Sequence, residues 1–333
     1  MRHDFKVHAA SCLQRLGITR WAENRRKVIH ILMLHKVNPV DHPLGLSIGP
    51  GLFEEVVVFL KEKYGILSLD QALGRLAGPD PGKGCVLTFD DGYRDNYDYA
   101  FPILKKHGAP ATIFVTLDAL DSGVFAWEPF DRAILAASRS ELDLESFGLG
   151  SLPLLEDRGP LLGELHQKLK ALPHARKCEI VNHVVAQLGD GMPGERSMLS
   201  WSEAREMADS GLMTIGAHTI SHPILSRVEP ETARREIVEG KALIEERLGR
   251  AVRHFAYPNG GRGDFDASHV SLVAGGGYLS ACTTLAGNCT SGSDPFRLKR
   301  IDLTPSVCLD TRGAFCPALL TAKLSGLFMR GGD

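Results

Sequence analysis

The sequence predicts an α/β protein: a distorted parallel (β/α) barrel of about seven strands with a mainly helical insertion. Two observations carry this prediction. Short apolar runs alternate with longer stretches of helical period, which is the pattern of parallel strands joined by helices. One segment, residues 118–199, breaks the alternation and is too long to be an ordinary connection between barrel elements.

Seven apolar runs have the length and composition of strands, and several end at glycine, proline or aspartate. Seven strands in alternation with helices favour a closed barrel over an open sheet. In chain order, the predicted strands are residues 30–34, 85–89, 111–115, 213–217, 252–256, 279–283 and 298–303.

Two of the helices between these strands have clear end signals. Ser200 and Glu203 have the spacing of a capping box, and Gly211 follows as the stop. Pro230 begins a second helix and Gly249 ends it. The apolar residues of this second helix form one stripe that we expect to face the core: Ala233, Ile237, Ile244 and Leu248.

We divide the chain into a barrel domain, residues 28–303, and two flanking regions. The insertion, 118–199, contains scattered leucines and prolines, and we expect it to cover or wall the site. Residues 304–333 form a helical tail, with a terminal helix over 317–329 docked on the barrel. Residues 1–27 carry seven basic side chains among apolar ones. They form either a basic amphipathic segment on an anionic membrane surface or a cap packed on the barrel.

Composition excludes several classes of protein. With 44% hydrophobic and 23% charged residues, the chain is neither disordered nor fibrous. A formal charge of −2 provides no overall field for nucleic acid, so we expect no nucleic-acid partner. No apolar run is long enough to span a membrane, and the first residues lack the core of a secretion signal. Seven cysteines without a CxxC pair fit a reducing compartment. We therefore expect a cytoplasmic protein.

The first candidate motif places Asp90 and Asp91 directly after a predicted strand and before Gly92. Adjacent strand residues point in opposite directions, but a turn at the strand end brings both carboxylates to one pocket. Asp-Gly is also a common turn signal, so the motif alone does not establish a site.

The second motif, His218-Thr219-Ile220-Ser221-His222, follows the strand 213–217. Two imidazoles four residues apart on a helical turn share one face and can reach one metal ion. Two surface histidines are the plain alternative. Two histidines and one carboxylate, however, form a known catalytic zinc set that leaves a position open for water.

Two further strand ends carry polar or special residues. His35 follows the first predicted strand, and Asn259 lies in a Pro-Asn-Gly-Gly turn that can aim a backbone N–H into a cavity. A buried or surface histidine and a plain turn are the alternatives. All four motifs follow strands, and in a parallel barrel the carboxyl ends of the strands share the face where active sites form.

Together the motifs resemble the polysaccharide deacetylase family, also called the NodB-homology or carbohydrate esterase family 4 domain. The resemblance covers residues 28–116 and 200–303 and rests on TFDDG, HTxSH and FAYPNG in that order. It implies a distorted barrel in which Asp91, His218 and His222 hold one divalent metal. Asp90 matches the catalytic base of the family. Carboxylate and imidazole ligands suit Zn²⁺, and Co²⁺ or Ni²⁺ could take its place.

The sequence departs from the family pattern in two places. Ala256 and Asn259 stand where the third motif often has an arginine and a tyrosine, so the base-orienting arginine is missing locally. Arg300 resembles the arginine of the fourth motif; it either reaches the Asp90 side of the pocket or lies on the surface. The usual C-terminal Leu-x-His is absent, and Leu34-His35-Lys36-Val37 instead resembles the YHxV segment of a subgroup, which makes His35 the candidate general acid.

The resemblance predicts hydrolysis of N-acetyl groups on an amino-sugar polysaccharide, oligosaccharide or glycolipid precursor. Asp90 would take a proton from water, the Asn259 N–H would complete an oxyanion hole, and His35 would protonate the leaving nitrogen. Two alternatives stay open. The chain hydrolyses another C–N bond, as in cyclic imides or ureides, or it is a non-catalytic carbohydrate-binding protein that keeps the metal site. The N-terminal segment adds a candidate contact with the inner face of the membrane.

Overall fold

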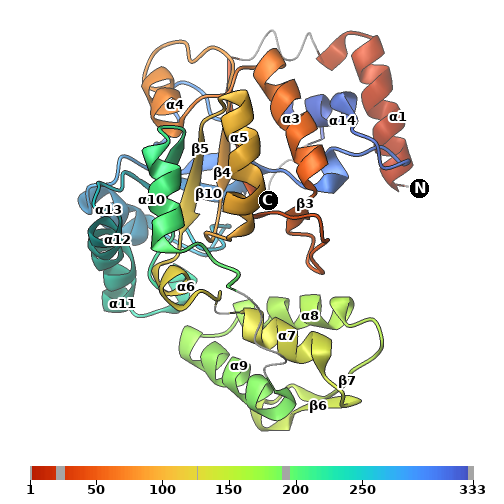
Figure 1. The fold of residues 1–333 in the computed structure, drawn as a ribbon, viewed down its shortest axis with the longest axis vertical. Helices are drawn as coiled ribbons and strands as arrows, with labels where there is room; N and C mark the ends of the chain where they lie inside the picture. Colours follow the sequence, from red (N-terminus) through yellow and green to blue (C-terminus); the bar gives the residue numbers. More distant parts are fainter. Residues whose placement is uncertain (1, 20–26, 126, 190–195, 329–333) are drawn as a thin grey trace.

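Seven parallel strands close into a barrel in the computed structural model, which describes residues 2–19, 27–125, 127–189 and 196–328 (Figure 1). Around the barrel the strand order is β1-β11-β10-β9-β8-β5-β4. The strands are β1 (Ile29–Leu34), β4 (Gly84–Phe89), β5 (Ala111–Val115), β8 (Met213–Ala217), β9 (His254–Ala256), β10 (Ser280–Ala286) and β11 (Leu298–Asp302). The predicted fold class is confirmed.

All seven predicted strands are present, with small differences at their ends. β5 and β8 match the predicted ranges. β9 begins later than predicted, because the N–H of Val252 donates to the Glu245 carboxylate at 2.8 Å instead of joining the sheet. β10 continues to Ala286, beyond the apolar run, and its last residues are less buried than its first.

The barrel is distorted because its neighbouring strands pair over unequal lengths. β1 pairs with β4 over six consecutive residues, whereas β8 pairs with β9 only through Ala217 and Phe255. The register between β10 and β11 shifts between Cys282 and Ala286. Close approach at β8 depends on Gly216, because a Cβ there would lie 2.5 Å from the Phe114 ring and 3.0 Å from the His254 carbonyl oxygen. Any larger residue would force these strands apart.

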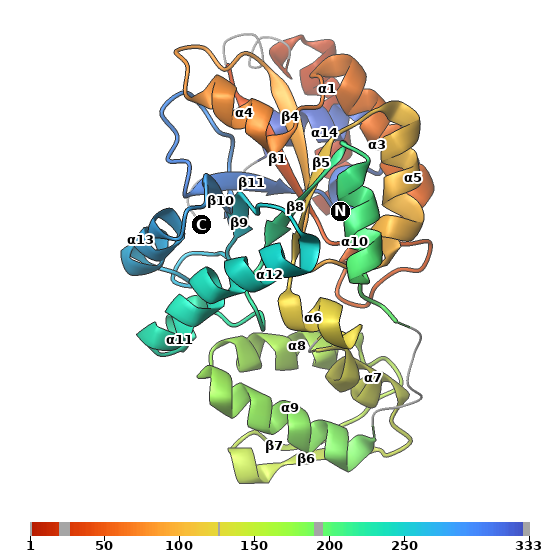
Figure 2. The same cartoon turned by 60° about the vertical axis from the view of Figure 1, so that its left-hand side comes forward.

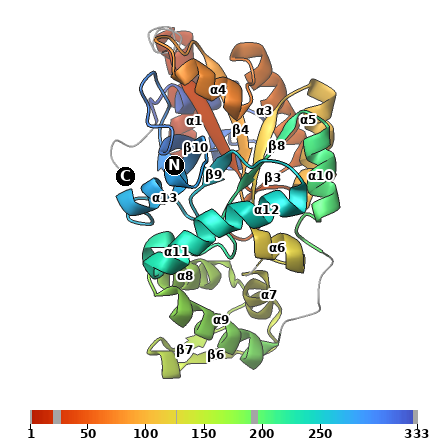
Figure 3. The same ribbon diagram turned by 90° about the vertical axis from the view of Figure 1, so that its left-hand side faces the viewer.

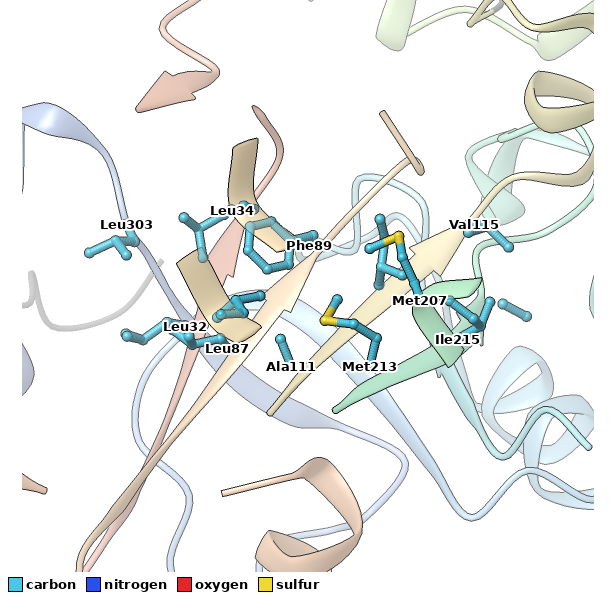
Figure 4. Close-up of a cluster of buried hydrophobic side chains, with 14 of the residues drawn as sticks. Leu32, Leu34, Leu87, Phe89, Ala111, Val115, Met207, Met213, Ile215 and Leu303 are labelled. Atoms are coloured by element: carbon cyan, nitrogen blue, oxygen red, sulfur yellow. The ribbon is translucent and has the colours of Figure 1, made fainter. Parts of the chain in front are cut away.

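The main core lies between the barrel and its covering helices, where side chains from β1, β4, β5 and β8 meet Met207 of α10 (Figure 4). These helices are α3 (Pro50–Lys63), α4 (Leu69–Leu76), α5 (Phe101–His107), α10 (Trp201–Asp209), α11 (Pro230–Arg234), α12 (Gly240–Leu248) and α13 (Ala267–Gly275). The predicted capping box is present at α10, where Ser200 and Glu203 exchange hydrogen bonds. The predicted helix from Pro230 to Gly249 is also present, and its stripe is buried.

Two of the helical segments contain a π-helical stretch. Residues Asn96–Ala100 form one ahead of α5, and residues Arg235–Glu239 form the other between α11 and α12. A π turn holds one residue more than an α turn and is frequent near functional sites. Both stretches contact the site described below.

The insertion forms a separate layer beyond one end of the barrel, reached through α6 (Leu117–Ser122) (Figures 2 and 3). It is mainly helical, with α7 (Glu128–Ala136), α8 (Gly159–Lys170) and α9 (His174–Leu188) around its own apolar cluster. It also contains a hairpin of β6 (Glu141–Leu144) and β7 (Gly150–Pro153), where we had expected no strands. The hairpin has one buried face, since Leu142 and Leu144 of β6 point into the cluster.

The described parts of the two ends of the chain pack against each other. Helix α1 (Arg2–Arg15) lies beside α14 (Pro317–Leu324), with Ala10 buried against Ala318, Leu319 and Ala322 (Figure 1). Phe5 and Leu16 of the same N-terminal region are 74% and 73% exposed. Residues 20–26 of the predicted N-terminal segment and 329–333 of the predicted tail lie outside the described residues. Among the helices described, none combines the length and the apolar character that crossing a membrane requires.

Short elements complete the chain. A two-stranded sheet pairs β2 (Lys36–Val37) with β3 (Ser47–Ile48) just after the first barrel strand. Three 3-10 turns occupy Glu145–Phe147, Leu225–Arg227 and Pro305–Val307.

Candidate active site and metal centre

The structure brings the predicted site residues to one place. A cavity of about 420 Å³ opens where the strands end, and six of the seven predicted residues line it: His35, Asp90, Asp91, His218, His222 and Asn259. The seventh, Arg300, is fully buried against Asp90. The opposite wall comes from the insertion.

Asp91, His218 and His222 form a compact group that could hold one metal ion. One ligand atom from each lies within 4.8 Å of the others, with 3.2 Å between the two Nε2 atoms and 3.4 Å from Asp91 Oδ1 to His222 Nε2. His218 Nδ1 lies 2.7 Å from the Ala256 carbonyl oxygen, so Nδ1 carries the proton and donates it. Nε2 of His218 is then left with a lone pair for a metal.

The electrostatics of this group favour a bound cation. Burial, together with the Asp90 charge, raises the pKa of Asp91 to about 8. Burial also lowers the pKa of both histidines. Without a cation, these shifts disfavour charge on the carboxyl group and on both imidazoles in a small buried space. A divalent cation that displaces the Asp91 proton fits this donor set, which is one that zinc accepts.

Asp90 has the opposite electrostatic character because of one partner. Arg300 donates from both terminal nitrogens to the two carboxylate oxygens, each at 2.7 Å, and its Nε donates to the Thr283 carbonyl. Burial alone would raise the pKa of Asp90, but the Arg300 charge and hydrogen bonds outweigh it and hold the pKa at about 2. A surface position for Arg300 is wrong, since the residue is 1% exposed.

The backbone is strained at the motifs. Within the described ranges, the non-glycine residues with positive φ are Asp91 (72°), Thr219 (69°), His222 (59°) and Asn259 (59°). All four lie in the motifs that contain Asp91, His222 and Asn259. Such conformations cost about 1–3 kcal/mol each and persist only where surrounding contacts hold them. The strain thus indicates that the ligand positions are fixed by the rest of the fold.

Glu236 is the residue that holds the histidine loop, and the sequence reasoning missed it. Its buried carboxylate accepts hydrogen bonds from the N–H groups of Ile220 (2.8 Å) and Ser221 (2.9 Å) and from the Ser221 hydroxyl (2.6 Å). It lies in the π-helical stretch Arg235–Glu239. A signal was present, because residue 236 follows Ala233 by three and therefore shares its buried face.

His35 follows β1 and faces the same cavity. Asn96, in the other π-helical stretch, donates from its side chain to the His35 carbonyl oxygen at 2.9 Å. Burial lowers the pKa of His35, and the Asp90 and Asp302 carboxylates oppose this shift without reversing it. The imidazole is therefore a stronger acid than usual when protonated.

The turn at Asn259 is built around two close contacts. Thr284 Oγ1 donates to the Asn259 carbonyl at 2.5 Å, and a Cβ on Gly260 would lie 2.8 Å from the Tyr257 carbonyl oxygen. Among the described residues, the backbone N–H of Asn259 has no hydrogen-bond acceptor. It is available to a ligand in the cavity.

The insertion and the loop after β1 add side chains that we did not predict as site residues. The Trp127 ring contacts His166 and lies under the Lys177 ammonium. His42, His166, Lys170 and Lys177 also line the cavity. Nothing in their spacing marks them, because only the folded insertion and the loop after β1 bring them over the strand ends.

Comparison with known proteins gives consistent matches. A family model described as polysaccharide deacetylase matches residues 77–274. A curated Bacillus subtilis (strain 168) protein with a provisional polysaccharide deacetylase name is 22% identical over 240 residues, which are 72% of this chain. The match covers 58% of that protein's length.

Two solved structures share the fold. The deacetylase PplD of Streptococcus pyogenes, in complex with acetate, has a TM-score of 0.60 and 22% identity, and the match covers 89% of this chain and 98% of that one. IcaB from Ammonifex degensii has a TM-score of 0.57 and 21% identity, with 90% and 98% covered.

The first prediction concerns Glu236. Replacing Glu236 with alanine leaves three loop donors unsatisfied and releases the strained Thr219–His222 segment, so we expect Zn²⁺ affinity to fall by on the order of 10–100-fold. Glu236→Gln keeps an acceptor and should retain most of the affinity. Competition with a chromophoric chelator measures both variants, and unchanged affinity in Glu236→Ala would remove the positioning role.

The second prediction concerns pH. A metal must displace the Asp91 proton below pH about 8, so apparent Zn²⁺ affinity should rise about tenfold per pH unit from 6.5 to 8 and then level off. Asp90→Asn removes the neighbouring negative charge, lowers the Asp91 pKa and should move this break to lower pH. A flat affinity profile between pH 6.5 and 8 in the unaltered protein would contradict the prediction.

Proposed function

Because this chain belongs to the polysaccharide deacetylase family, we propose that it is a metal-dependent hydrolase that removes N-acetyl groups from amino sugars. The substrate is an N-acetylated polysaccharide, oligosaccharide or glycolipid precursor. The metal is Zn²⁺, with Co²⁺ or Ni²⁺ as alternatives, held by Asp91, His218 and His222. PplD, which shares the fold, was solved with acetate, the product that this reaction would release.

One observation carries the proposal: two adjacent aspartates of opposite character face one cavity. Asp90 is ionised and paired with Arg300, while Asp91 lies with two histidines in a group that could hold a cation. Environments that push two pKa values apart mark separate chemical roles. A base beside a metal centre is what hydrolysis of an unactivated amide needs.

Asp90 and Asn259 act on the first half of the reaction. When bound, the metal supplies Lewis acidity, which polarises the amide carbonyl and lowers the pKa of water. Asp90, ionised at any physiological pH, takes a proton from the water whose oxygen attacks the carbonyl carbon. The free N–H of Asn259 donates to the oxyanion that forms.

His35 acts on the second half. An amine is a poor leaving group, so the C–N bond breaks only as the nitrogen receives a proton. His35 donates that proton from its position after β1, and acetate and the free amino sugar leave. Arg300 does not touch substrate; it orients Asp90 and keeps it charged.

Two alternatives share this machinery. The insertion walls the cavity, which favours a small substrate and keeps hydrolysis of a cyclic imide or ureide open. A carbohydrate-binding protein without turnover would also keep the metal centre. A location in the cytoplasm at the inner face of the membrane stays a proposal; the exposed Phe5 and Leu16 support it.

The third prediction tests the function. Metal-loaded protein should release acetate from N-acetylated glucosamine oligosaccharides and leave hydantoin and dihydrouracil unchanged. Asp90→Asn keeps the volume of the side chain and removes the base, so it should retain metal and lose kcat by on the order of 10²-fold or more. Metal content and acetate release are measured on the same samples.

Each outcome of this experiment separates the alternatives. Ring opening of the cyclic substrates without acetate release would replace deacetylation with the second activity. Saccharide binding without any turnover would favour the binding protein. Loss of metal from Asp90→Asn would show that the two aspartates have been assigned the wrong way round.

The fourth prediction concerns His35. His35→Ala should strongly reduce deacetylation of an N-acetyl sugar but spare hydrolysis of an aryl acetate, whose leaving group needs no proton. Since burial lowers the pKa of His35 below its ordinary 6.5, amide kcat/KM should fall as the pH rises through that lowered value. The His35→Ala variant should not show this fall in amide kcat/KM.

Metal content is the control for His35→Ala and should equal that of the unaltered protein. An equal loss of activity on amide and ester would indicate a structural histidine instead. If neither substrate were affected, the proton would come from another group.

A further inference from the structure

The insertion places two lysines in the wall that faces the metal centre. Lys170 is the last residue of α8 and Lys177 lies in the first half of α9, and both line the cavity together with the strand-end residues. Both ammonium groups act electrostatically on His222 across this cavity. Lys177 is only 7% exposed.

Lys177 has no anionic partner among the residues that the structure describes. Its Nζ lies 3.6 Å from the centre of the Trp127 ring, and the groups that influence its charge are Lys170 and the Cys178 thiol. Burial lowers the pKa of Lys177 to about 8. A cation–π contact offsets only part of the hydration free energy that an ammonium group loses when it is buried. A buried, unpaired cation at a cavity wall therefore indicates a binding site for an anionic ligand.

The acidic residues of the cavity are already engaged. Asp90 pairs with Arg300, and Asp131 lies 2.7 Å from His166. Glu128 accepts from the Ser197 hydroxyl and faces Lys36. Asp91 belongs to the metal group. None of these carboxylates forms an ion pair with Lys177, and a divalent metal would add further positive charge to the cavity.

We propose that Lys177, assisted by Lys170, binds a negatively charged group of the substrate, a carboxylate or phosphate on or next to the acetylated sugar. The inference rests on the proposed deacetylase function and narrows it to acidic amino-sugar substrates. The insertion is then the part of the protein that selects the substrate, while the barrel performs the chemistry.

The experiment compares matched charged and neutral probes. N-acetylglucosamine linked to glucuronic acid is compared with its methyl ester, and N-acetylglucosamine 1-phosphate with methyl N-acetylglucosaminide. The first pair tests a carboxylate and the second a phosphate. Acetate release gives kcat/KM, and calorimetry with the Asp90→Asn protein gives binding without turnover.

Lys177→Met is the test variant, because methionine keeps an unbranched apolar side chain and removes the charge. The preference for one charged probe over its neutral match, measured as a ratio of kcat/KM, should fall by on the order of 10²-fold. Lys177→Arg should restore much of it. Lys168→Met is the control, since Lys168 lies in the neighbouring helix α8 of the insertion but pairs with Glu164 at the surface.

Two further readouts distinguish anion binding from a structural role. Removing an unpaired buried charge should leave the Tm of Lys177→Met equal or higher, whereas a structural lysine would lower it. Raising the NaCl concentration should weaken binding of the charged probe to the Lys177 protein more than to Lys177→Met.

The outcomes separate this inference from the proposed function. Equal kcat/KM for the charged and neutral probes would overturn the anion site and leave the deacetylase proposal standing. Equal losses on both probes in Lys177→Met would also overturn it. Lys177-dependent binding of a charged probe without acetate release from any substrate would uphold the anion site and overturn the deacetylase function.

Discussion

The ion pair between Arg300 and Asp90 is the interaction on which the site depends. It links the middle of β11 to the residue that follows β4 and holds a negative charge in a buried position. That charge, added to burial, raises the pKa of the neighbouring Asp91. Two chemically identical side chains in adjacent positions thereby have pKa values shifted in opposite directions.

The barrel was predictable because its strands are local features of the chain. Runs such as 111–115 and 213–217 begin within three residues of a glycine and end at a polar residue, so they can be found from nearby residues alone. The hairpin in the insertion was missed although Glu141–Leu144 alternates polar and apolar residues, since four residues are too few for a period to stand out. Family motifs then located the candidate ligands at the strand ends.

Contacts between residues that are far apart in the chain could not be predicted from the sequence. Arg300 and Asp90 are 210 residues apart, so the arginine motif alone was compatible with both a pocket and a surface position for Arg300. Lys177 sits in a helix with an ordinary amphipathic pattern, and its burial follows from the way the insertion closes over the cavity. Burial and pairing of charged groups are tertiary properties, and the site is built mostly from them.

The π-helical stretch Arg235–Glu239 has a consequence for how this chain can vary in length. Glu236 and Ile237 both face inward there, one towards the Ser221 loop and one towards the core. Because a π turn holds one residue more than an α turn, deleting one of its other residues would restore a regular α-helix with little rotation of the two halves. The same deletion within α12 would rotate the residues after it by about 100° and turn Ile244 and Leu248 out of the core. The chain can therefore lose one residue at the π-helical stretch more readily than within the regular helix that follows it.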